Sequence, residues 1–218
     1  HLRPGNLVIL ESTSPVGTTE TIADWLRKKR PDLQIPQWQG AWQTPDPKVS
    51  TPAGKQQQIF VAHCPERVLP GNLLRELVEN DRTVGGLDRA SALKAKELYR
   101  TVSKGDVRLT DSRTAELTKL VENSYRDVNI AFANELSMIC DRLQLNVWDV
   151  VSIANRHPRV NILQPGPGVG GHCIAVDPWF IVHSAPDEAR LIRTAREVNY
   201  AKTKHVTDKV FACADKFK

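Results

Sequence analysis

The chain has 218 residues, of which 40% are hydrophobic and 25% are charged, and its formal net charge is +5. This composition is ordinary for a soluble globular protein, and no apolar run reaches the roughly 18 residues that a membrane span needs. We therefore expect a cytoplasmic protein with no membrane partner. We also expect no nucleic-acid partner, because the basic residues are dispersed and many of them stand near acidic ones.

The four cysteines are scattered along the chain, and no two of them have C-x-x-C spacing. They are Cys64, Cys140, Cys173 and Cys213. This distribution argues against a zinc site and against a disulfide framework. We expect free thiols in a reducing compartment and no bound metal.

The first 110 residues alternate apolar runs of strand length with helix-like segments, which is the pattern of an α/β domain. The predicted elements are, in chain order, a strand at 7–10, a helix at 20–29, a strand at 58–62, a short helix after residue 71, a Gly85-Gly86 turn, a helix at 88–102 and a strand near Val107. We expect Thr18 or Thr19 to cap the first helix, because a hydroxyl oxygen accepts hydrogen bonds from free helix amides. The connection over residues 31–55 is long enough to be functional or an insertion.

The pattern changes at Thr114, from which apolar residues recur at helical spacing without a proline as far as about Leu145. This predicts one helix with a length on the order of 45 Å. A shorter helix over 147–155 comes next, and a last helix is predicted from Pro186 to the C-terminus, because proline and acidic residues suit a first turn. The long helix has more apolar surface than a small domain can cover, so we expect it to pair with a second copy.

A glycine-rich loop over residues 166–173 ends at Cys173, four residues before Asp177. Glycines allow a ligand to approach the backbone, and a thiol at that place can act as a nucleophile. The glycines also fit G-x-G-x-x-G, the dinucleotide fingerprint. We reject that match, because the fingerprint needs a strand before it and a helix after it, whereas Pro178 breaks the segment after the loop.

Lys119, Asn123 and Arg126 follow one another at four and three residues, so they form a polar stripe on one face of the long helix. Such a stripe is more often a solvated face, but an amine, an amide and a guanidinium together could line an anion site. Glu66 stands directly after a strand, where an α/β sheet binds its ligands. A surface salt bridge is an equally good interpretation of Glu66.

Asn155, His157 and Arg159 alternate just before the glycine-rich loop, so we expect them to approach the same region as Cys173. A lone histidine is more often structural, and a lone cysteine is more often a small buried hydrophobic residue. A thiol among cations and backbone amides, however, has the environment that activates a cysteine as a nucleophile. The prediction of a reactive Cys173 therefore depends on the whole cluster.

Several motifs together resemble one family, the nucleotide-sugar 6-dehydrogenases of the UDP-glucose/GDP-mannose dehydrogenase type. The matching segments are Ser12-Thr13-Ser14-Pro15-Val16-Gly17-Thr18, Cys64-Pro65-Glu66-Arg67-Val68, Ala115-Glu116-Leu117-Thr118-Lys119-Leu120 with Asn123, and Gly170-Gly171-His172-Cys173 with Asp177. They stand in the family's order across most of the chain, so the resemblance is specific.

The resemblance implies an α/β part followed by an all-α part. Residues 1–110 would be the C-terminal part of a Rossmann-like NAD-binding domain, without the half that carries G-x-G-x-x-G. Residues 111–218 would be a central helical catalytic and dimerisation domain like that of 6-phosphogluconate dehydrogenase, ending in a linker helix. Since the pyrophosphate of NAD needs the missing half, we expect the isolated chain to be inactive and still to form a homodimer through the long helix.

The resemblance also implies a four-electron oxidation of a sugar C6 alcohol to a carboxylate, with two NAD used in turn. After the first hydride transfer Cys173 would trap the aldehyde as a thiohemiacetal, and the second transfer would leave a thioester that water hydrolyses. The run from Asn155 to Cys173 resembles the members that act on UDP-N-acetylhexosamines, and the expected substrate is UDP-N-acetyl-D-mannosamine. UDP-N-acetylglucosamine is the alternative within the family, and a non-catalytic oligomerisation module is the alternative from another class.

By the same resemblance, Lys119 would give and take a proton, and Asn123 would steady the developing oxyanion. Asp177 and Glu66 would handle the water and its proton. The implied substrate-binding positions are Lys119, Asn123, Arg67, Val68, Arg126, His157, Arg159 and Gly170, and the implied NAD contacts are Thr13 and Thr19.

Overall fold

A computed structural model describes residues 1–38, 40–42, 57–68 and 71–217 of the chain. The chain divides into two compact units, an N-terminal unit over His1–Lys119 and a C-terminal unit over Leu120–Lys218. The division falls inside the long helix α4 (Ser112–Leu143), which begins in the first unit and continues in the second. Most of the predicted long connection over residues 31–55 lies outside the described residues.

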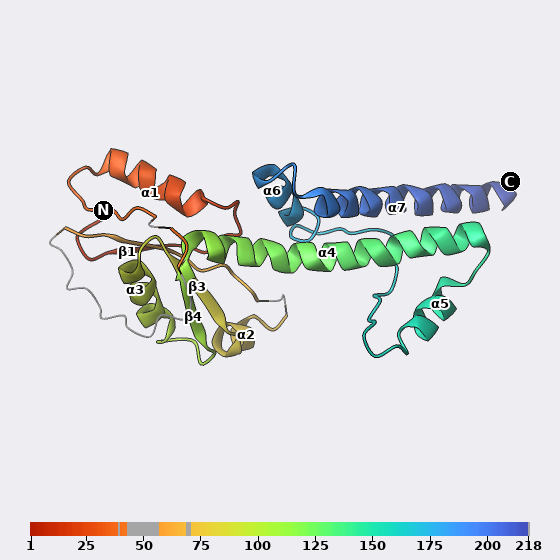
Figure 1. Ribbon diagram of the computed structural model, residues 1–218, viewed down its shortest axis with the longest axis horizontal. Coiled ribbons are helices and arrows are strands. Elements are labelled where there is room, and N and C mark those ends of the chain that lie inside the picture. The colour runs from red at the N-terminus through yellow and green to blue at the C-terminus, as the bar shows by residue number, and fades with distance from the viewer. Residues whose placement is uncertain (39, 43–56, 69–70, 218) are drawn as a thin grey trace. The chain divides into compact units, whose positions relative to one another are not determined.

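The N-terminal unit contains a four-stranded mixed sheet in the order β1-β2-β3-β4 (Figure 1). The strands are β1 (Leu7–Leu10), β2 (Phe60–His63), β3 (Arg82–Gly86) and β4 (Val107–Asp111). β1 runs parallel to β2 and β3 runs parallel to β4, whereas β2 and β3 are antiparallel. The predicted strands at 7–10, at 58–62 and near Val107 are thereby confirmed, with small shifts of their ends.

Two glycines that were predicted to form a turn lie inside this sheet instead. Gly85 and Gly86 end β3, so the predicted Gly85-Gly86 turn is wrong. A Cβ added to Gly85 would lie 2.5 Å from the Asp111 carbonyl oxygen, and one added to Gly86 would lie 2.3 Å from the Asp88 carbonyl oxygen. Neighbouring backbone therefore packs so closely on β3 that no side chain fits. Glycine can thus occur in a strand because of close packing as well as in a turn.

Helices α1 (Thr18–Lys29) and α3 (Arg89–Tyr99) cover the sheet, and each contributes to its own apolar cluster (Figure 1). The cluster with α1 consists of Ala23, Leu33, Ile35, Ile59, Val61 and Leu87, and the cluster with α3 consists of Ala62, Cys64, Val84, Ala95, Tyr99 and Val107. Because successive strand residues point to opposite faces, Val61 and Ala62 place the two clusters on opposite faces of the sheet. The short helix α2 (Leu73–Glu79) has no buried residue.

Helix α1 begins earlier than predicted, and neither candidate threonine caps it. Its N-cap is Gly17, which has a φ of 94° and offers no side-chain oxygen. The Thr18 hydroxyl donates to the Pro15 carbonyl oxygen at 2.6 Å, and Thr19 lies inside the first turn. The predicted cap is therefore wrong, and the free amides of α1 find their acceptor elsewhere in the unit.

The C-terminal unit is helical throughout its described elements. After α4 come α5 (Val147–Ala154), α6 (Asp177–Ser184) and α7 (Arg190–Ala214), with a single 3-10 turn at Asp215–Phe217. The predicted last helix is confirmed as α7, although it begins at Arg190 and not at Pro186, and α6 was not predicted at all. Pro178 lies in the first turn of α6, where its missing N–H costs no hydrogen bond, so this proline starts a helix instead of breaking one.

Helix α7 runs alongside the second half of α4, in the same direction (Figure 1). Polar pairs join the two helices in ascending order: Asp127 with Arg196, Asn134 with Asn199, Ser137 with Lys202, and Asp141 with His205. The predicted long helix is thus confirmed as α4, and these polar pairs connect it with α7. No described helix, α4 included, combines the length and the apolar character that a membrane crossing requires.

Candidate active site

Cys173 lies on an exposed loop of the C-terminal unit, directly before α6. Its thiol is free and its side chain is exposed. The carbonyl oxygen of Cys173 accepts the N–H groups of Val176 at 3.0 Å and Asp177 at 2.9 Å. A Cβ added to Gly170 or Gly171 would meet no atom within 4 Å, so this side of the loop is open. A reactant can therefore approach the sulfur over bare backbone.

Two predicted catalytic residues are brought together beside this loop. Asn123 on α4 donates from Nδ2 to Oδ2 of Asp177 at 2.6 Å, and the two side chains are only 6% and 4% exposed. Asp177 is the first residue of α6, where the positive end of the helix dipole favours a carboxylate. The bond fixes the orientation of the Asn123 amide, so the direction of its second N–H is fixed as well.

The glycine-rich loop is tied to α4 and α7 by buried side-chain amides. The N–H of Gly166 donates to Oδ1 of Asn134 at 2.9 Å, and Nδ2 of Asn134 donates to Oδ1 of Asn199 at 2.8 Å. Gly168 has a φ of 144°, and a Cβ there would lie 2.1 Å from the hydroxyl oxygen of Thr203. The loop backbone therefore packs directly on α7, and only glycine fits at position 168.

The same network ends on a buried ion pair between α4 and α7. Nη1 of Arg196 donates to Oδ1 of Asp127 at 2.6 Å, and the side chains are 1% and 0% exposed. Nδ2 of Asn199 donates to the same oxygen at 2.8 Å. Burial raises the pKa of Asp127 above its ordinary value, although Arg196 and Asn199 act in the opposite direction. Asn199 thus connects the ion pair, through Asn134, to the loop that carries Cys173.

The structure does not join the other predicted groups to Cys173. Asn155 closes a turn instead, since its side chain bonds the N–H and the carbonyl oxygen of Ile162 at 2.7 and 3.0 Å. Nδ1 of His157 accepts the N–H of Arg159 at 3.3 Å, and both of these residues are exposed. Within the described part of the chain, no hydrogen bond or ion pair connects the three residues with Cys173. The substrate-binding roles of His157 and Arg159 stay predictions.

The predicted polar stripe on α4 is not uniform in burial. Lys119 is half-buried, Asn123 is buried and Arg126 is exposed. Among residues 1–38, 40–42, 57–68 and 71–217, neither Lys119 nor Arg126 has a hydrogen bond or ion pair from its side chain. Both cationic groups are thus available to a ligand, and their roles, like that of the exposed Gly170, stay predictions.

Glu66 and its neighbours lie at the edge of the sheet from which the loops after β1 and β2 both leave. The N–H of Glu66 donates to the carbonyl oxygen of Glu11 at 3.2 Å, which ties the two loops together. Oε1 of Glu66 accepts the N–H groups of Arg67 and Val68 at 2.6 and 2.9 Å, so the carboxylate is held by its own loop. The carboxyl ends of parallel strands are where α/β sheets bind their cofactors. The position fits a site of this kind.

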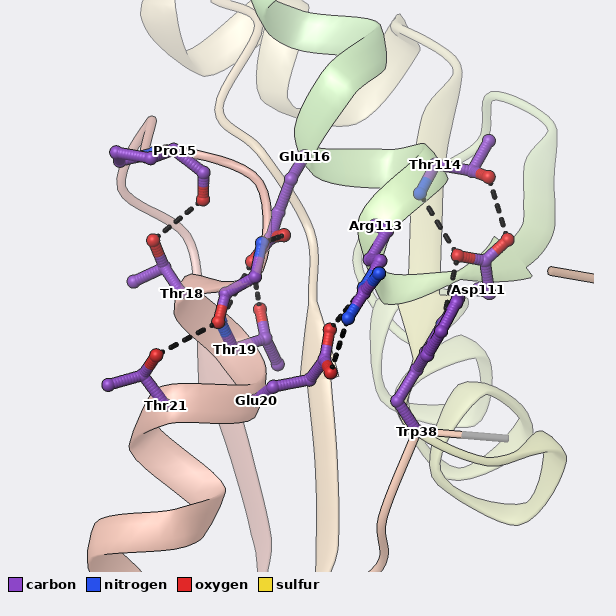
Figure 2. Close-up of polar contacts among 11 residues, drawn as sticks. Pro15, Thr18, Thr19, Glu20, Thr21, Trp38, Asp111, Arg113, Thr114 and Glu116 are labelled. Atoms are coloured by element: carbon purple, nitrogen blue, oxygen red, sulfur yellow. Dashed lines mark hydrogen bonds and ion pairs between the residues drawn. The ribbon is translucent and has the colours of Figure 1, made fainter. Parts of the chain in front are cut away.

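The two predicted NAD contacts differ in environment. Thr13 lies half-buried in the loop after β1, whereas Thr19 is 1% exposed. The N–H and the hydroxyl of Thr19 donate to Oε1 of Glu116 at 2.8 and 2.6 Å (Figure 2). The N–H of Gly17 donates to Oε2 of Glu116 at 2.6 Å. Both polar groups of Thr19 are therefore already bound within the chain, and its contact with NAD stays a prediction.

Glu116 supplies the cap that α1 lacks, and the sequence analysis did not single it out. Its side chain is 1% exposed. Burial raises the pKa of Glu116, although the hydrogen bonds from Thr19 and Gly17 lower it. The available signal was an acid between Ala115 and Leu117, among the apolar positions of the predicted helix, where a charge needs a specific partner.

Further polar contacts hold the start of α4 (Figure 2). Asp111 accepts from the N–H and the hydroxyl of Thr114 at 3.1 and 2.7 Å, and from Nε1 of Trp38 at 3.3 Å. Arg113 donates twice to Glu20 of α1, at 2.6 and 3.0 Å, and its guanidinium lies 3.7 Å from the centre of the Trp38 ring. Trp38 therefore packs the chain after α1 onto the first turn of α4.

Comparisons with known proteins place the chain in a family. Residues 1–103 match the model of the NAD binding domain of the UDP-glucose/GDP-mannose dehydrogenase family, and residues 113–201 match the model of its central domain. The chain therefore belongs to the UDP-glucose/GDP-mannose dehydrogenase family. The expected fold class, α/β followed by a helical part, is confirmed.

Particular relatives carry more specific names. The chain is 60% identical over 217 residues to an NDP-N-acetyl-D-galactosaminuronic acid dehydrogenase from Ralstonia nicotianae. The aligned residues make up 100% of this chain and 48% of that relative. It is 57% identical over 211 residues to the UDP-N-acetyl-D-mannosamine dehydrogenase of Escherichia coli, with 97% of this chain and 47% of that relative aligned. A solved UDP-D-ManNAc dehydrogenase from Pyrococcus horikoshii is 39% identical with a TM-score of 0.81 and covers 99% and 46%. The chain spans about half the length of these relatives.

Proposed function

We propose that the protein containing residues 1–218 oxidises the C6 alcohol of UDP-N-acetyl-D-mannosamine to a carboxylate, with NAD as the hydride acceptor. The observation that carries this proposal is the surroundings of Cys173, an exposed free thiol on open glycine backbone next to the buried Asn123–Asp177 pair. The membership of the chain in a dehydrogenase family supports the same conclusion.

The first oxidation converts the C6 alcohol to an aldehyde. Bound NAD supplies the acceptor for one hydride in each of the two oxidations. Lys119, one helical turn before Asn123 on α4, takes the proton of the C6 hydroxyl. Asn123 donates its second N–H to the sugar oxygen as negative charge develops there, while its first N–H stays bound to Asp177.

The second oxidation proceeds on Cys173. Its sulfur adds to the aldehyde carbon while the aldehyde oxygen gains a proton. The resulting thiohemiacetal then loses a hydride to the acceptor named above and its hydroxyl proton to Lys119, which leaves a thioester. Water then attacks the carbonyl carbon, the C–S bond breaks, and the acid and the free thiol are released. Asp177 and Glu66 are the carboxylates that we propose for the proton of this water. A thiol suits the sequence because it adds readily to an aldehyde and also leaves readily on hydrolysis.

The identity of the sugar is the finer part of the proposal. UDP-N-acetyl-D-mannosamine is favoured by the names of the Escherichia coli relative and of the Pyrococcus horikoshii structure. A nucleotide-linked N-acetyl-D-galactosamine is the second candidate, favoured by the 60% identity to the Ralstonia protein. The candidates share the 2-acetamido group and the nucleotide and differ in the configuration of the ring carbons.

The test supplies NAD and one UDP-N-acetylhexosamine at a time to the protein that contains residues 1–218. The sugars are the mannosamine, galactosamine and glucosamine epimers, and NADH is followed by absorbance while the product is identified by mass spectrometry. We expect the mannosamine compound to give the highest kcat/KM and a uronate product. If only another epimer gives NADH, the proposed substrate is wrong. If none of the three gives NADH, the proposed activity is refuted.

We also propose that the protein is a homodimer through α4. Support comes from large apolar side chains that are exposed on one face of α4, at spacings of four, seven and eleven residues. They are Val121, Phe132, Ile139 and Leu143, with exposed fractions of 49%, 57%, 47% and 60%. Sedimentation should give a dimer for the native sequence and a monomer for Phe132→Glu. Lys29→Glu also places a glutamate at an exposed helical position, but on α1, and should stay dimeric.

For residues 1–218 alone we propose that the dimer persists and that turnover is absent. The pyrophosphate of NAD binds at a glycine-rich turn between a strand and a helix. None of the strand–helix junctions in the described residues carries G-x-G-x-x-G. Steady NADH production by these residues alone would contradict this part of the proposal.

A further inference from the structure

A buried carboxylate at the start of α4 binds the end of the loop that comes after β1. Glu116 accepts three hydrogen bonds at 2.6 to 2.8 Å. Two come from the N–H and the hydroxyl of Thr19 (Figure 2), and the third comes from the N–H of Gly17. Hydrogen bonds to a carboxylate are shorter and stronger than those between neutral groups. At 1% exposure, water cannot replace them. Glu116 therefore determines where this end of the loop lies.

The cap of α1 comes from a distant part of the chain, which distinguishes it from an ordinary helix cap. Most helices take their cap from the side chain of the N-cap residue, and this contact holds the helix alone. Here the N-cap is Gly17, and the acceptor stands 97 to 99 residues further along the chain. A long-range cap couples two elements, because α1 and its preceding loop cannot shift without breaking the contact with α4.

The loop that Glu116 holds stands at the edge of the sheet where α/β proteins bind their cofactors. β1 and β2 are parallel, and the N–H of Cys64 donates to the carbonyl oxygen of Leu10 at 3.0 Å, so both strands end at this edge. The start of α4 reaches the same place. Gly85 pairs with His63, the last residue of β2, and a Cβ on Gly85 would lie 2.6 Å from the Cβ of Ala115.

We propose that Glu116 is a positioning residue that fixes the loop over residues 12–18, and Thr13 within it, relative to α4 for the binding of NAD. The inference rests on the proposed function, in which Thr13 contacts NAD and Lys119 stands three residues beyond Glu116 on the same helix. Glu116 itself acts through Gly17 and Thr19 and touches no reactant.

The same contact determines where a phosphate of NAD does not bind. A helix N-terminus with free amides is a ready site for a phosphate. In α1 the amides of Gly17 and Thr19 already face the carboxylate of Glu116, and a second anion there would meet its negative charge. The N-terminus of α1 therefore does not fit a phosphate, and a nucleotide bound at this edge would contact the loop before Gly17 instead.

The test compares Glu116→Gln and Glu116→Asp with a matched control, Glu20→Gln. Glu20 also joins α1 to α4, through Arg113, but this pair is partly exposed and holds no loop amide. In the protein that contains residues 1–218, calorimetric titration gives the Kd for NAD and the Kd for the UDP-sugar. Hydrogen exchange followed by mass spectrometry reports the amides of residues 17–19.

We expect Glu116→Gln to raise the Kd for NAD about tenfold, which corresponds to one charge-assisted hydrogen bond, and to leave the Kd for the UDP-sugar within about twofold. The Asp variant, which keeps the charge but is shorter, should fall between the native protein and the Gln variant. The amides of residues 17–19 should exchange faster in both variants, and the control should match the native protein in all three readouts.

Two results would overturn the inference. Unchanged exchange at residues 17–19 would mean that Glu116 does not hold the loop, and equal weakening of NAD and UDP-sugar would mean a general loss of structure. These measurements need no turnover. A protein that binds NAD as expected but produces no NADH would therefore uphold the role of Glu116 and refute the proposed reaction.

Discussion

Helix α4 carries two buried carboxylates, and the two units of the chain satisfy them in different ways. Glu116 accepts hydrogen bonds from the uncharged N–H and hydroxyl groups of Gly17 and Thr19. Asp127 faces the guanidinium of Arg196 and the amide of Asn199. Burial raises the pKa of both acids. Hydrogen bonds from neutral donors lower the pKa of Glu116, whereas the largest effect that lowers the pKa of Asp127 comes from the Arg196 cation.

The difference determines what a substitution leaves behind. When the partner of a buried ion is removed, the remaining charge stays uncompensated in a medium that solvates it poorly. When a buried carboxylate that has only neutral donors is changed to an amide of the same shape, no charge remains and part of the hydrogen bonding survives. We therefore expect the stability of the C-terminal unit to fall far more when the partner of Asp127 is removed than the stability of the N-terminal unit falls when Glu116 is changed to an amide.

The largest expected effect is that of Arg196→Leu, which leaves Asp127 buried without its cation. The free energy of unfolding should fall by about 3–5 kcal/mol, as is typical of a broken buried ion pair. Urea unfolding followed by circular dichroism measures this change. Lys204→Met on the same helix α7 is the matched control, because it removes an exposed pair with Asp208 and should have no measurable effect. If both variants lose the same free energy of unfolding, burial does not determine how much an ion pair stabilises this unit.

A smaller loss is expected for Asn134→Ala, which keeps the ion pair but removes the link to the glycine-rich loop. Gly166 loses its acceptor and Asn199 loses a donor, so the free energy of unfolding should fall by about 1–3 kcal/mol. Hydrogen exchange at Gly166 should rise in the variant. If exchange there stays at the native rate, Asn134 does not hold the loop that carries Cys173.

A still smaller loss, about 1 kcal/mol at neutral pH, is expected for Glu116→Gln, and it should depend on pH. The folded-state pKa of Glu116 is raised, so the folded state holds its proton at pH values where the unfolded chain has already lost it. The resulting stabilisation is present below the unfolded pKa and is lost as the pH rises through the folded pKa. The native protein should therefore lose stability relative to Glu116→Gln over this window. Urea unfolding of both proteins at a series of pH values tests the sign, and a relative gain with rising pH would contradict it.

The smallest effect is expected for Glu20→Gln, which removes the second contact between α1 and α4. Arg113 and Glu20 are 44% and 23% exposed, and exposed pairs contribute about 0–1 kcal/mol. Thermal unfolding should show a change close to experimental error. A loss as large as that of Glu116→Gln would mean that the number of contacts between the helices, and not the burial of one carboxylate, decides the stability of the N-terminal unit.

Elements with strong local patterns could be predicted from the sequence. The run Leu7–Leu10 and the regular apolar spacing of α4 gave a strand and a helix at the right places. Local patterns with two physical meanings led to errors. The Gly85-Gly86 pair suits a turn but also suits close packing inside a strand, and Pro178 ends some helices but also begins others. Only the tertiary neighbours decide between such meanings.

The candidate site could be predicted in part for the same reason. Cys173 and its open loop depend on local glycines, so the sequence was sufficient for them. The bond between Asn123 and Asp177 spans 54 residues, and the family motifs named both partners without showing that they meet. Glu116 was missed because its partners, Gly17 and Thr19, lie in a segment that no local periodicity connects with α4.

The role of Cys173 in the second oxidation is tested by the number of NADH molecules formed per UDP-N-acetyl-D-mannosamine consumed, in the native protein and in Cys173→Ala. Both proteins can carry out the first oxidation, but only the native protein can hold the aldehyde on sulfur for the second. We expect two NADH per sugar and a uronate for the native protein, and one NADH per sugar and an aldehyde for Cys173→Ala. Two NADH per sugar from the variant would contradict the role of Cys173 and with it the proposed mechanism.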